Sequence, residues 1–200
     1  MLVNELAKED LITAALIGEG YLDNYNAKDE LVIPFAKEKS FYLYNLLKDN
    51  SYKDSIRFEA RRGQFKIDIT DNISLVQSWY ESGQKVFKKE LAFKYLSFRS
   101  VVIAVNVFGE RKIEGITVPS TIPNEFIRTL SYCIERKLNL TVVSGKNCIK
   151  IPEVPNLFLE TYKNLDTFDS TQLLSYLTKA EKSKLVEIST RKSEEFYVEN

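Results

Sequence analysis

The order of secondary-structure signals repeats once along this 200-residue chain, and that repeat constrains the fold more than any other feature. Each half is expected to contain a helix ending in glycine, strand-like segments, a second helix, a hairpin and a third helix. The turn glycines Gly63 and Gly145 lie 82 residues apart, and the helix-ending glycines Gly20 and Gly109 lie 89 apart. The pattern predicts an internal duplication without visible identity between the halves.

The two hairpins are the clearest strand signals. In the first, apolar residues alternate with polar ones over residues 56–60 and 65–69, on either side of the turn pair Arg62-Gly63. In the second, residues 141–143 and 148–151 flank Ser144–Asn147. One face of the first hairpin is apolar and is predicted to cover a core. The strand-like run over residues 30–36 contains Pro34, which indicates a sheet edge or a bulge.

Helical spacing covers four longer segments. Residues 5–18 place small side chains (Ala14, Ala15 and Gly18) on one face, which favours close approach of another helix. Residues 98–108 form an apolar helix, and Pro123 opens a helix that is expected to run to Leu138. A charge-balanced helical segment is expected over residues 172–186.

Composition excludes several classes of chemistry. The chain has no histidine, which removes histidine-based acid–base catalysis, Ser-His and Cys-His nucleophiles and histidine metal sites. Lys plus Arg and Asp plus Glu both number 28, so the net charge is zero. A neutral chain is a poor match for a protein that coats nucleic acid indiscriminately, although a local basic face remains compatible with it.

Compartment is inferred from cysteines and termini. Cys133 and Cys148 form no zinc pattern and are expected to be reduced, half-buried thiols rather than a disulfide. The N-terminus lacks the pattern of a secretion signal, and the longest apolar run, Val101–Val105, is too short to span a bilayer. We therefore expect a soluble intracellular protein. Richness in Lys, Asn, Tyr, Phe and Ile points to a phage, a low-GC bacterium or an organelle.

Three segments together carry a family resemblance. The first is Leu16–Leu22 (LIGEGYL), and the second is Trp79-Tyr80 followed by Gly83–Val86 (GQKV). The third is the apolar helix Phe98–Phe108 with Gly109 after it. In this order they resemble the LAGLIDADG homing endonuclease family in its two-repeat, single-chain form, over roughly residues 8–168.

The resemblance implies an α+β fold: a duplicated αββαββα saddle of two pseudo-symmetric halves, packed through the two motif helices, with a helical tail at the C-terminus. It divides the chain into a first repeat (1–83), a basic linker (84–97), a second, degenerate repeat (98–168) and a charged helical tail (169–200).

The resemblance also implies what the helix ends do. In the family, each motif helix ends in an acid, and the two acids hold divalent metal ions that polarise phosphate and activate water. Glu19 takes the place of the first acid and is a candidate metal ligand, unless it is a helix-end carboxylate without a special role. Phe108 takes the place of the second acid, and Glu110 would need a shifted turn to replace it. The motif is therefore vestigial, and no residue is assigned as catalytic.

A saddle of this kind lays its polar sheet face in the major groove, where basic side chains contact phosphate and read guanine edges. Lys85 and Lys88 begin a locally basic stretch, although a solvated surface explains such a stretch equally well. The complete set of candidate nucleic-acid contacts is Arg57, Arg61, Arg62, Lys66, Lys85, Lys88, Arg111, Lys112, Lys146 and Lys150.

These features predict a sequence-selective binder of double-stranded DNA, with a regulatory role as one use, that is descended from a homing endonuclease and has lost its nuclease activity. It needs no cofactor, does not bind membranes and acts as a monomer, with a homodimer or a protein partner for the tail as the alternatives. Three other functions stay open: an active or nicking Mg²⁺-dependent endonuclease, a maturase that binds structured intron RNA, and a protein-interaction or structural component.

Overall fold

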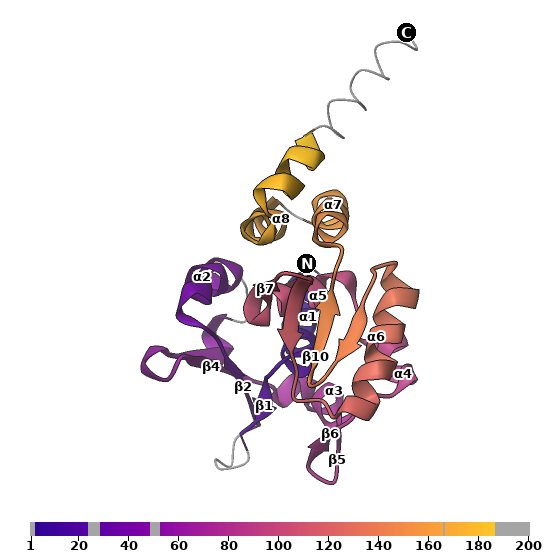
Figure 1. The fold of residues 1–200 in the computed structure, drawn as a ribbon. Helices are drawn as coiled ribbons and strands as arrows, with labels where there is room; N and C mark the ends of the chain where they lie inside the picture. Colours follow the sequence, from indigo (N-terminus) through magenta and orange to yellow (C-terminus); the bar gives the residue numbers. More distant parts are fainter. Residues whose placement is uncertain (1–2, 24–28, 49–52, 166, 187–200) are drawn as a thin grey trace. The chain divides into compact units, whose positions relative to one another are not determined.

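The computed structural model describes residues 3–23, 29–48, 53–165 and 167–186. The chain divides into two compact units, residues 1–152 and 153–200. The first unit contains helices and two four-stranded antiparallel sheets (Figure 1), which confirms the predicted α+β class.

The two sheets have equivalent strand orders, β1-β2-β4-β3 and β7-β8-β10-β9. In each sheet the second and fourth strands along the chain pair at the centre, and all pairs are antiparallel. The strands of the first sheet are β1 (Tyr21–Leu22), β2 (Glu30–Pro34), β3 (Ile56–Glu59) and β4 (Gln64–Asp68). Those of the second are β7 (Glu110–Lys112), β8 (Gly115–Pro119), β9 (Val143–Gly145) and β10 (Cys148–Ile151). This shared order agrees with the repeat read from the sequence.

The first hairpin forms as predicted, with Phe58 opposite Phe65 and Gly63 in its turn at φ +60°. Phe65 and Ile67 are fully buried, as alternation requires. Phe58 differs from the expectation, because 45% of it stays exposed. Its ring packs 5.5 Å from that of Phe65, at the margin of the core rather than inside it.

Pro34 was predicted to lie at a sheet edge or a bulge. Its strand, β2, lies between β1 and β4, so it is not an edge strand. Its position is nevertheless compatible with a missing N–H group. Strand β1 pairs only with Leu31 and Val32, so it does not reach Pro34, the last residue of β2.

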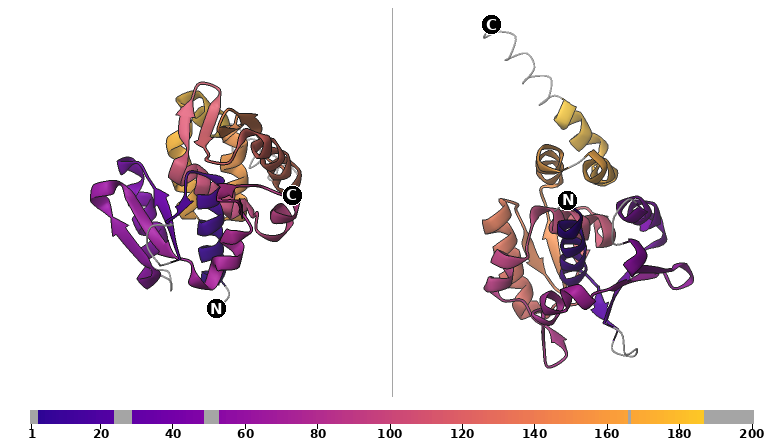
Figure 2. Two further views of the ribbon diagram at one scale, coloured as in Figure 1. Left: turned by 90° about the horizontal axis from the view of Figure 1, so that it is seen from below. Right: turned by 180° about the vertical axis from the view of Figure 1, so that it is seen from behind.

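Two central helices, α1 (Val3–Ile17) and α5 (Phe98–Phe108), pack against each other between the two sheets (Figures 1 and 2). Close packing follows from their small residues, since Ala14, Ala15 and Ala104 are almost wholly buried. Ser97 caps α5 by accepting a hydrogen bond from the Ser100 N–H at 2.9 Å, and its hydroxyl donates to Asp10 of α1. The helix over residues 98–108 was predicted with its correct bounds.

The segment predicted as a basic linker, residues 84–97, is an ordered part of this unit. After α3 (Ile73–Gln77), strands β5 (Tyr80–Glu81) and β6 (Gln84–Lys85) form a hairpin, and α4 (Lys89–Lys94) follows. Trp79 and Phe87 are buried with ring centroids 5.2 Å apart. These two aromatic residues anchor the segment to the core.

The remaining helices of the first unit are α2 (Ser40–Lys48) and α6 (Asn124–Leu138), and α6 packs on β9, β10 and α4. Short 3₁₀ helices occupy Lys37–Lys39, Lys53–Ser55, Ala60–Arg62 and Thr70–Asn72. Cys133 and Cys148 are free thiols, as predicted, but both are buried rather than half-buried.

The second unit is helical, with α7 (Val154–Asn164), α8 (Thr167–Leu173), a 3₁₀ turn (Leu174–Tyr176) and a helix over residues 179–186. The single helix expected over 172–186 is therefore interrupted. Leu177 is extended, and Thr178 starts a new helix through a reciprocal cap. The Thr178 N–H donates to the Glu181 carboxylate at 2.7 Å, and the Glu181 N–H donates to the Thr178 hydroxyl at 3.2 Å.

Candidate functional site

The ends of α1 and α5 occupy equivalent places in the two halves. Glu19 is followed by Gly20 and then by the first residue of β1, and Phe108 is followed by Gly109 and then by the first residue of β7. The structure therefore aligns Glu19 with Phe108 by position in the chain path.

Helix α1 ends in a tight turn that presents Glu19 to solvent. The Gly18 N–H donates to the Ala14 carbonyl at 3.0 Å, and the Gly20 N–H donates to the Ala15 carbonyl at 2.9 Å. A Cβ at Gly20 would lie 2.7 Å from the Ala15 carbonyl oxygen, so this turn requires glycine. Glu19, between the two glycines, is exposed.

Phe108 fills the space beside this turn instead of extending a polar group into it. Its ring is only 7% exposed and lies against Gly18. An ideal Cβ at Gly18 would lie 2.3 Å from Cδ2 and 2.5 Å from Cε2 of the ring. The aromatic side chain is thus packed into the α1–α5 junction, where the resemblance expects an acid.

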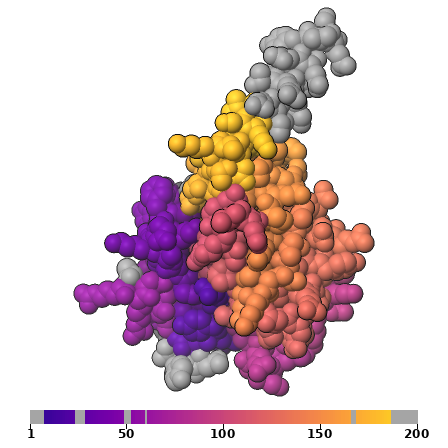
Figure 3. Space-filling view, in the orientation of Figure 1, coloured from indigo at the N-terminus to yellow at the C-terminus, as the bar shows by residue number. Residues whose placement is uncertain are grey.

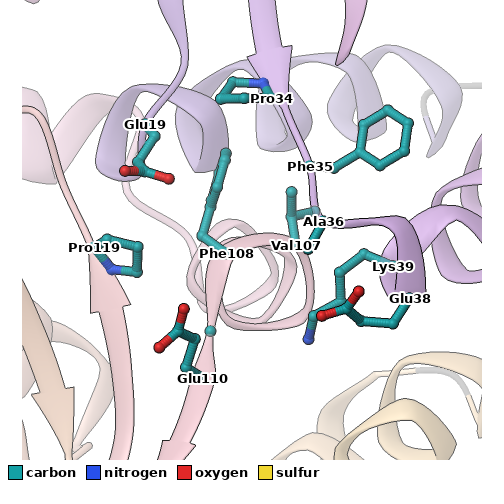
Figure 4. A pocket seen from close by; sticks show the side chains of 11 residues that line it. Glu19, Pro34, Phe35, Ala36, Glu38, Lys39, Val107, Phe108, Glu110 and Pro119 are labelled. Atoms are coloured by element: carbon teal, nitrogen blue, oxygen red, sulfur yellow. The ribbon is translucent and has the colours of Figure 1, made fainter. Parts of the chain in front are cut away.

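A pocket of about 190 Å³ opens beside these helix ends (Figure 4). Glu19 and Glu110 point into it on one side of the Phe108 ring, and Glu38 and Lys39 lie on the other side. The Glu110 carboxylate is held by Lys112 at 2.6 Å, and this hydrogen bond lowers its pKa. Lys39 was not among the residues predicted from the sequence to lie here.

The donor set of this pocket does not fit the metal site that the resemblance implies. Phe108 offers no oxygen, and Glu110 is already paired with Lys112. Within the part of the chain that the structure describes, no three acidic or thiol side chains gather in a metal-binding arrangement. A hard divalent ion prefers several oxygen ligands, so Glu19 is left as a weak single donor.

Lys85 does not lie on the surface where a phosphate contact was expected. It is 5% exposed, and its ammonium group donates to the carbonyls of Leu16 at 3.0 Å and Gly18 at 3.1 Å. It thereby satisfies the carbonyl end of α1, where a positive charge is favourable. Burial lowers the pKa of Lys85 from 10.5 to about 7, and the nearby charge of Glu19 opposes this shift.

Lys66 likewise departs from its predicted exposed position. It is 6% exposed and forms ion pairs with Asp23 and, at 3.7 Å, with Glu30. The hydrogen bond from Lys66 to Asp23 raises the pKa of the ammonium group. On the same sheet face, Arg57 pairs with Glu30 at 3.2 Å and with Glu59 at 3.6 Å. The positive charge of this face is largely neutralised by its own acids.

Arg61 and Arg62 lie at the exposed tip of the β3–β4 hairpin, which projects from the first sheet (Figure 3). Arg62 pairs with Glu59 at 3.4 Å, with the arginine side chain 73% exposed. An ion pair this exposed is weak and can be exchanged for a phosphate contact. Both side chains are exposed, as the predicted contact with a polyanion requires.

The second sheet separates the predicted residues onto two faces. Lys112 and Lys150 share one face, with Lys112 paired to Glu110 and Lys150 paired to Glu114 at 3.1 Å. Arg111 is opposite Ile116 in the ladder and therefore faces the other side. Lys146 is exposed in the β9–β10 turn, and Lys88 pairs with Glu81 beside the β5–β6 hairpin.

Comparison with solved structures shows what this arrangement resembles. The chain matches the homing endonuclease I-WcaI bound to its DNA recognition sequence, with a TM-score of 0.55 and 14% sequence identity. The match covers 90% of this chain and 86% of that one. No protein-family model and no curated protein sequence matches the chain. No helix within the described residues is both long and apolar enough to cross a membrane.

The match to I-WcaI over most of both chains shows that this protein has the fold of a homing endonuclease.

Proposed function

We propose that this protein binds double-stranded DNA in a sequence-selective manner and descends from a LAGLIDADG homing endonuclease by internal loss of the cutting site. The contact between Phe108 and Gly18 carries this proposal. In this proposal, the buried ring of Phe108 stands in place of a carboxylate, and α1 still packs against α5.

The likeness to a homing endonuclease in complex with DNA supports duplex DNA as the ligand. The equivalent strand orders of the two sheets support an origin by duplication, and a duplicated chain supplies both DNA-binding halves as a monomer. Acids that pair with the basic side chains on the polar face of each sheet favour sequence-selective binding. They weaken non-specific attraction to phosphate, while a correctly placed base edge can still be bound. Binding of this kind requires no cofactor, and the two free thiols suit an intracellular location.

The decisive experiment is a selection of bound duplexes from a randomised pool, followed by a cleavage assay on the selected sequence with Mg²⁺ or Mn²⁺. We expect an enriched sequence that binds equally with and without metal and stays intact. Efficient double-strand cleavage that Glu19→Gln abolishes would establish an active endonuclease instead.

A second candidate is a protein-interaction or structural role without nucleic acid. The ion pairs of Arg57, Lys66, Lys112 and Lys150 favour it, because the positive charge of these side chains is already neutralised by acids of the same chain. Attraction to phosphate is strongest at low salt, so absence of any duplex or RNA binding under those conditions would select this second candidate. Preference for a folded intron over duplex DNA would select the maturase.

A further inference from the structure

A groove between α4 and α6 combines exposed aromatic rings with cations, and it lies outside the pocket at the helix ends. Its volume is about 310 Å³. Lys89 and Phe93 line it from α4, and Tyr132, Arg136 and Lys137 line it from α6. We call it the α4–α6 groove.

Two aromatic side chains of the α4–α6 groove are open to solvent. Phe93 is 82% exposed and Tyr132 is 50% exposed. The Tyr132 ring has a cation from each helix near it, with Lys89 Nζ 5.9 Å and Arg136 Cζ 5.7 Å from its centroid. A flat ligand that stacks on Tyr132 would therefore have positive charge within reach on two sides.

The cations here differ from those of the sheets because they are not neutralised. Among the described residues, none of Lys89, Arg128 and Arg136 forms an ion pair with an acid, whereas the lysines on the polar sheet faces do. The exposed acids on the same two helices are Glu90, Glu125 and Glu135. With Lys94 and Lys137 included, α4 and α6 carry five cations against these three acids, although the whole chain is neutral.

The two walls of the groove are fixed to each other. Lys137 of α6 donates to the carbonyls of Ala92 at 2.6 Å and Phe93 at 3.2 Å, which closes the C-terminal end of α4. The platform is therefore formed before a ligand arrives, and little ordering is required on binding.

The groove and the sheet faces use different side chains. On α6, Ile127, Leu130 and Ile134 are buried, while Arg128, Tyr132 and Arg136 recur every four residues along the exposed side. A ligand on this stripe would leave the hairpin arginines Arg61 and Arg62 free to contact a duplex.

We propose that the α4–α6 groove binds single-stranded nucleic acid. Unpaired bases stack on Tyr132 and Phe93, and backbone phosphates are held by Lys89, Arg128 and Arg136. Stacking on aromatic rings combined with a basic track is the physical basis of binding to single strands and tolerates any base. A duplex hides its base faces and cannot use the rings in this way.

The test measures fluorescence anisotropy of the full chain with labelled single-stranded DNA and single-stranded RNA of about 15 nucleotides, and with a blunt duplex, at low salt. The key variants are Tyr132→Ala and the charge reversal Lys89→Glu/Arg136→Glu. The hairpin reversal Arg61→Glu/Arg62→Glu changes charge by the same amount and is the matched control. Tyr132→Phe keeps the ring without the hydroxyl. Thermal unfolding establishes that each variant is folded.

We expect Tyr132→Ala to weaken single-strand binding about tenfold, Tyr132→Phe to leave it unchanged, and the groove reversal to reduce it further. The hairpin reversal should reduce single-strand binding much less than the groove reversal does. No single-strand binding at low salt would overturn the proposal, and so would equal losses in both reversals. Equal competition by poly-glutamate would show a surface for acidic protein instead. Loss of duplex affinity alone in the groove variants would assign the groove to the duplex. Comparison of the DNA and RNA strands identifies the preferred backbone.

Discussion

The ring of Phe108 occupies the space that a side chain at Gly18 would need, with Cδ2 only 2.3 Å from the ideal Cβ position. The two residues therefore depend on each other: the ring requires glycine beneath it, and the glycine leaves a gap that the ring fills.

Gly18→Ala should destabilise the protein by about 1–3 kcal/mol, because the buried ring has little room to move. In a Phe108→Ala background the same change should have a much smaller effect, which a double-mutant cycle measured by urea unfolding would show as coupling. Gly83→Ala is the control, because nothing lies within 4 Å of its Cβ position and its φ of +78° alone makes it unfavourable. The packing described would be contradicted if Gly18→Ala and Phe108→Ala showed no coupling. It would also be contradicted if Gly83→Ala and Phe108→Ala were coupled.

Phe108→Asp should place a carboxylate at the end of α5, beside Glu19 at the end of α1. We expect weak Mn²⁺ binding by calorimetry, since two helix-end acids supply the oxygen ligands that a divalent ion prefers. Phe108→Asn has a similar shape without the charge and should bind no metal. If the folded aspartate variant bound no more Mn²⁺ than the asparagine variant, the positional match between Glu19 and Phe108 would lose its functional meaning.

Arg61→Glu/Arg62→Glu should weaken duplex binding and leave the free energy of unfolding nearly unchanged, because both side chains are exposed at the hairpin tip. Each lost phosphate contact should reduce the slope of log affinity against log salt by about 1. A salt titration measures this slope. Arg128→Glu, a single reversal on α6, should leave the duplex slope unchanged. Identical slopes for the hairpin variant and the wild type would remove the tip from the DNA-binding surface.

Lys85 should make stability rise with pH. Its pKa falls from 10.5 to about 7 on burial, so between these values the unfolded chain binds more protons than the folded protein. The free energy of unfolding then increases with pH in this window, by up to about 1.4 kcal/mol per pH unit from this group. Below about pH 7 both states carry the proton and the full burial penalty applies.

Urea unfolding of the wild type and Lys85→Met across this window isolates the contribution, because other titrating groups are common to both proteins. The stability of the wild type relative to the variant should increase with pH. In Glu19→Gln the increase should begin at lower pH, because the charge of Glu19 raises the pKa of Lys85. A pH-independent difference would show that Lys85 stays charged in the folded state.

Local signals explain which parts of the fold were readable from sequence. Ser97 and Gly109 bracket an apolar helix of 11 residues, so its bounds follow from capping and periodicity alone. Period-two alternation would also have found the face of Arg111, because Glu110 and Lys112 necessarily point the other way.

The environment of the charged candidates was not readable, because it depends on residues distant in the chain. Lys66 meets Asp23 across 43 positions, and Lys85 meets Leu16 across 69. A lysine in a basic stretch looks solvated until the partner element is placed over it. The two aromatic residues Trp79 and Phe87, which fold the expected linker into the core, were the available clue to the burial of Lys85.

The two sheets share a strand order but differ in their side chains. In the central strand β4 of the first sheet, Lys66 is buried and paired with acids. In the equivalent strand β10 of the second sheet, Lys150 pairs with Glu114 of the β7–β8 turn. A duplex lying across both would meet two different chemical surfaces joined in a fixed order. The preferred sequence should therefore lack two-fold symmetry, and reversing one half of it should abolish recognition even though its base composition is unchanged.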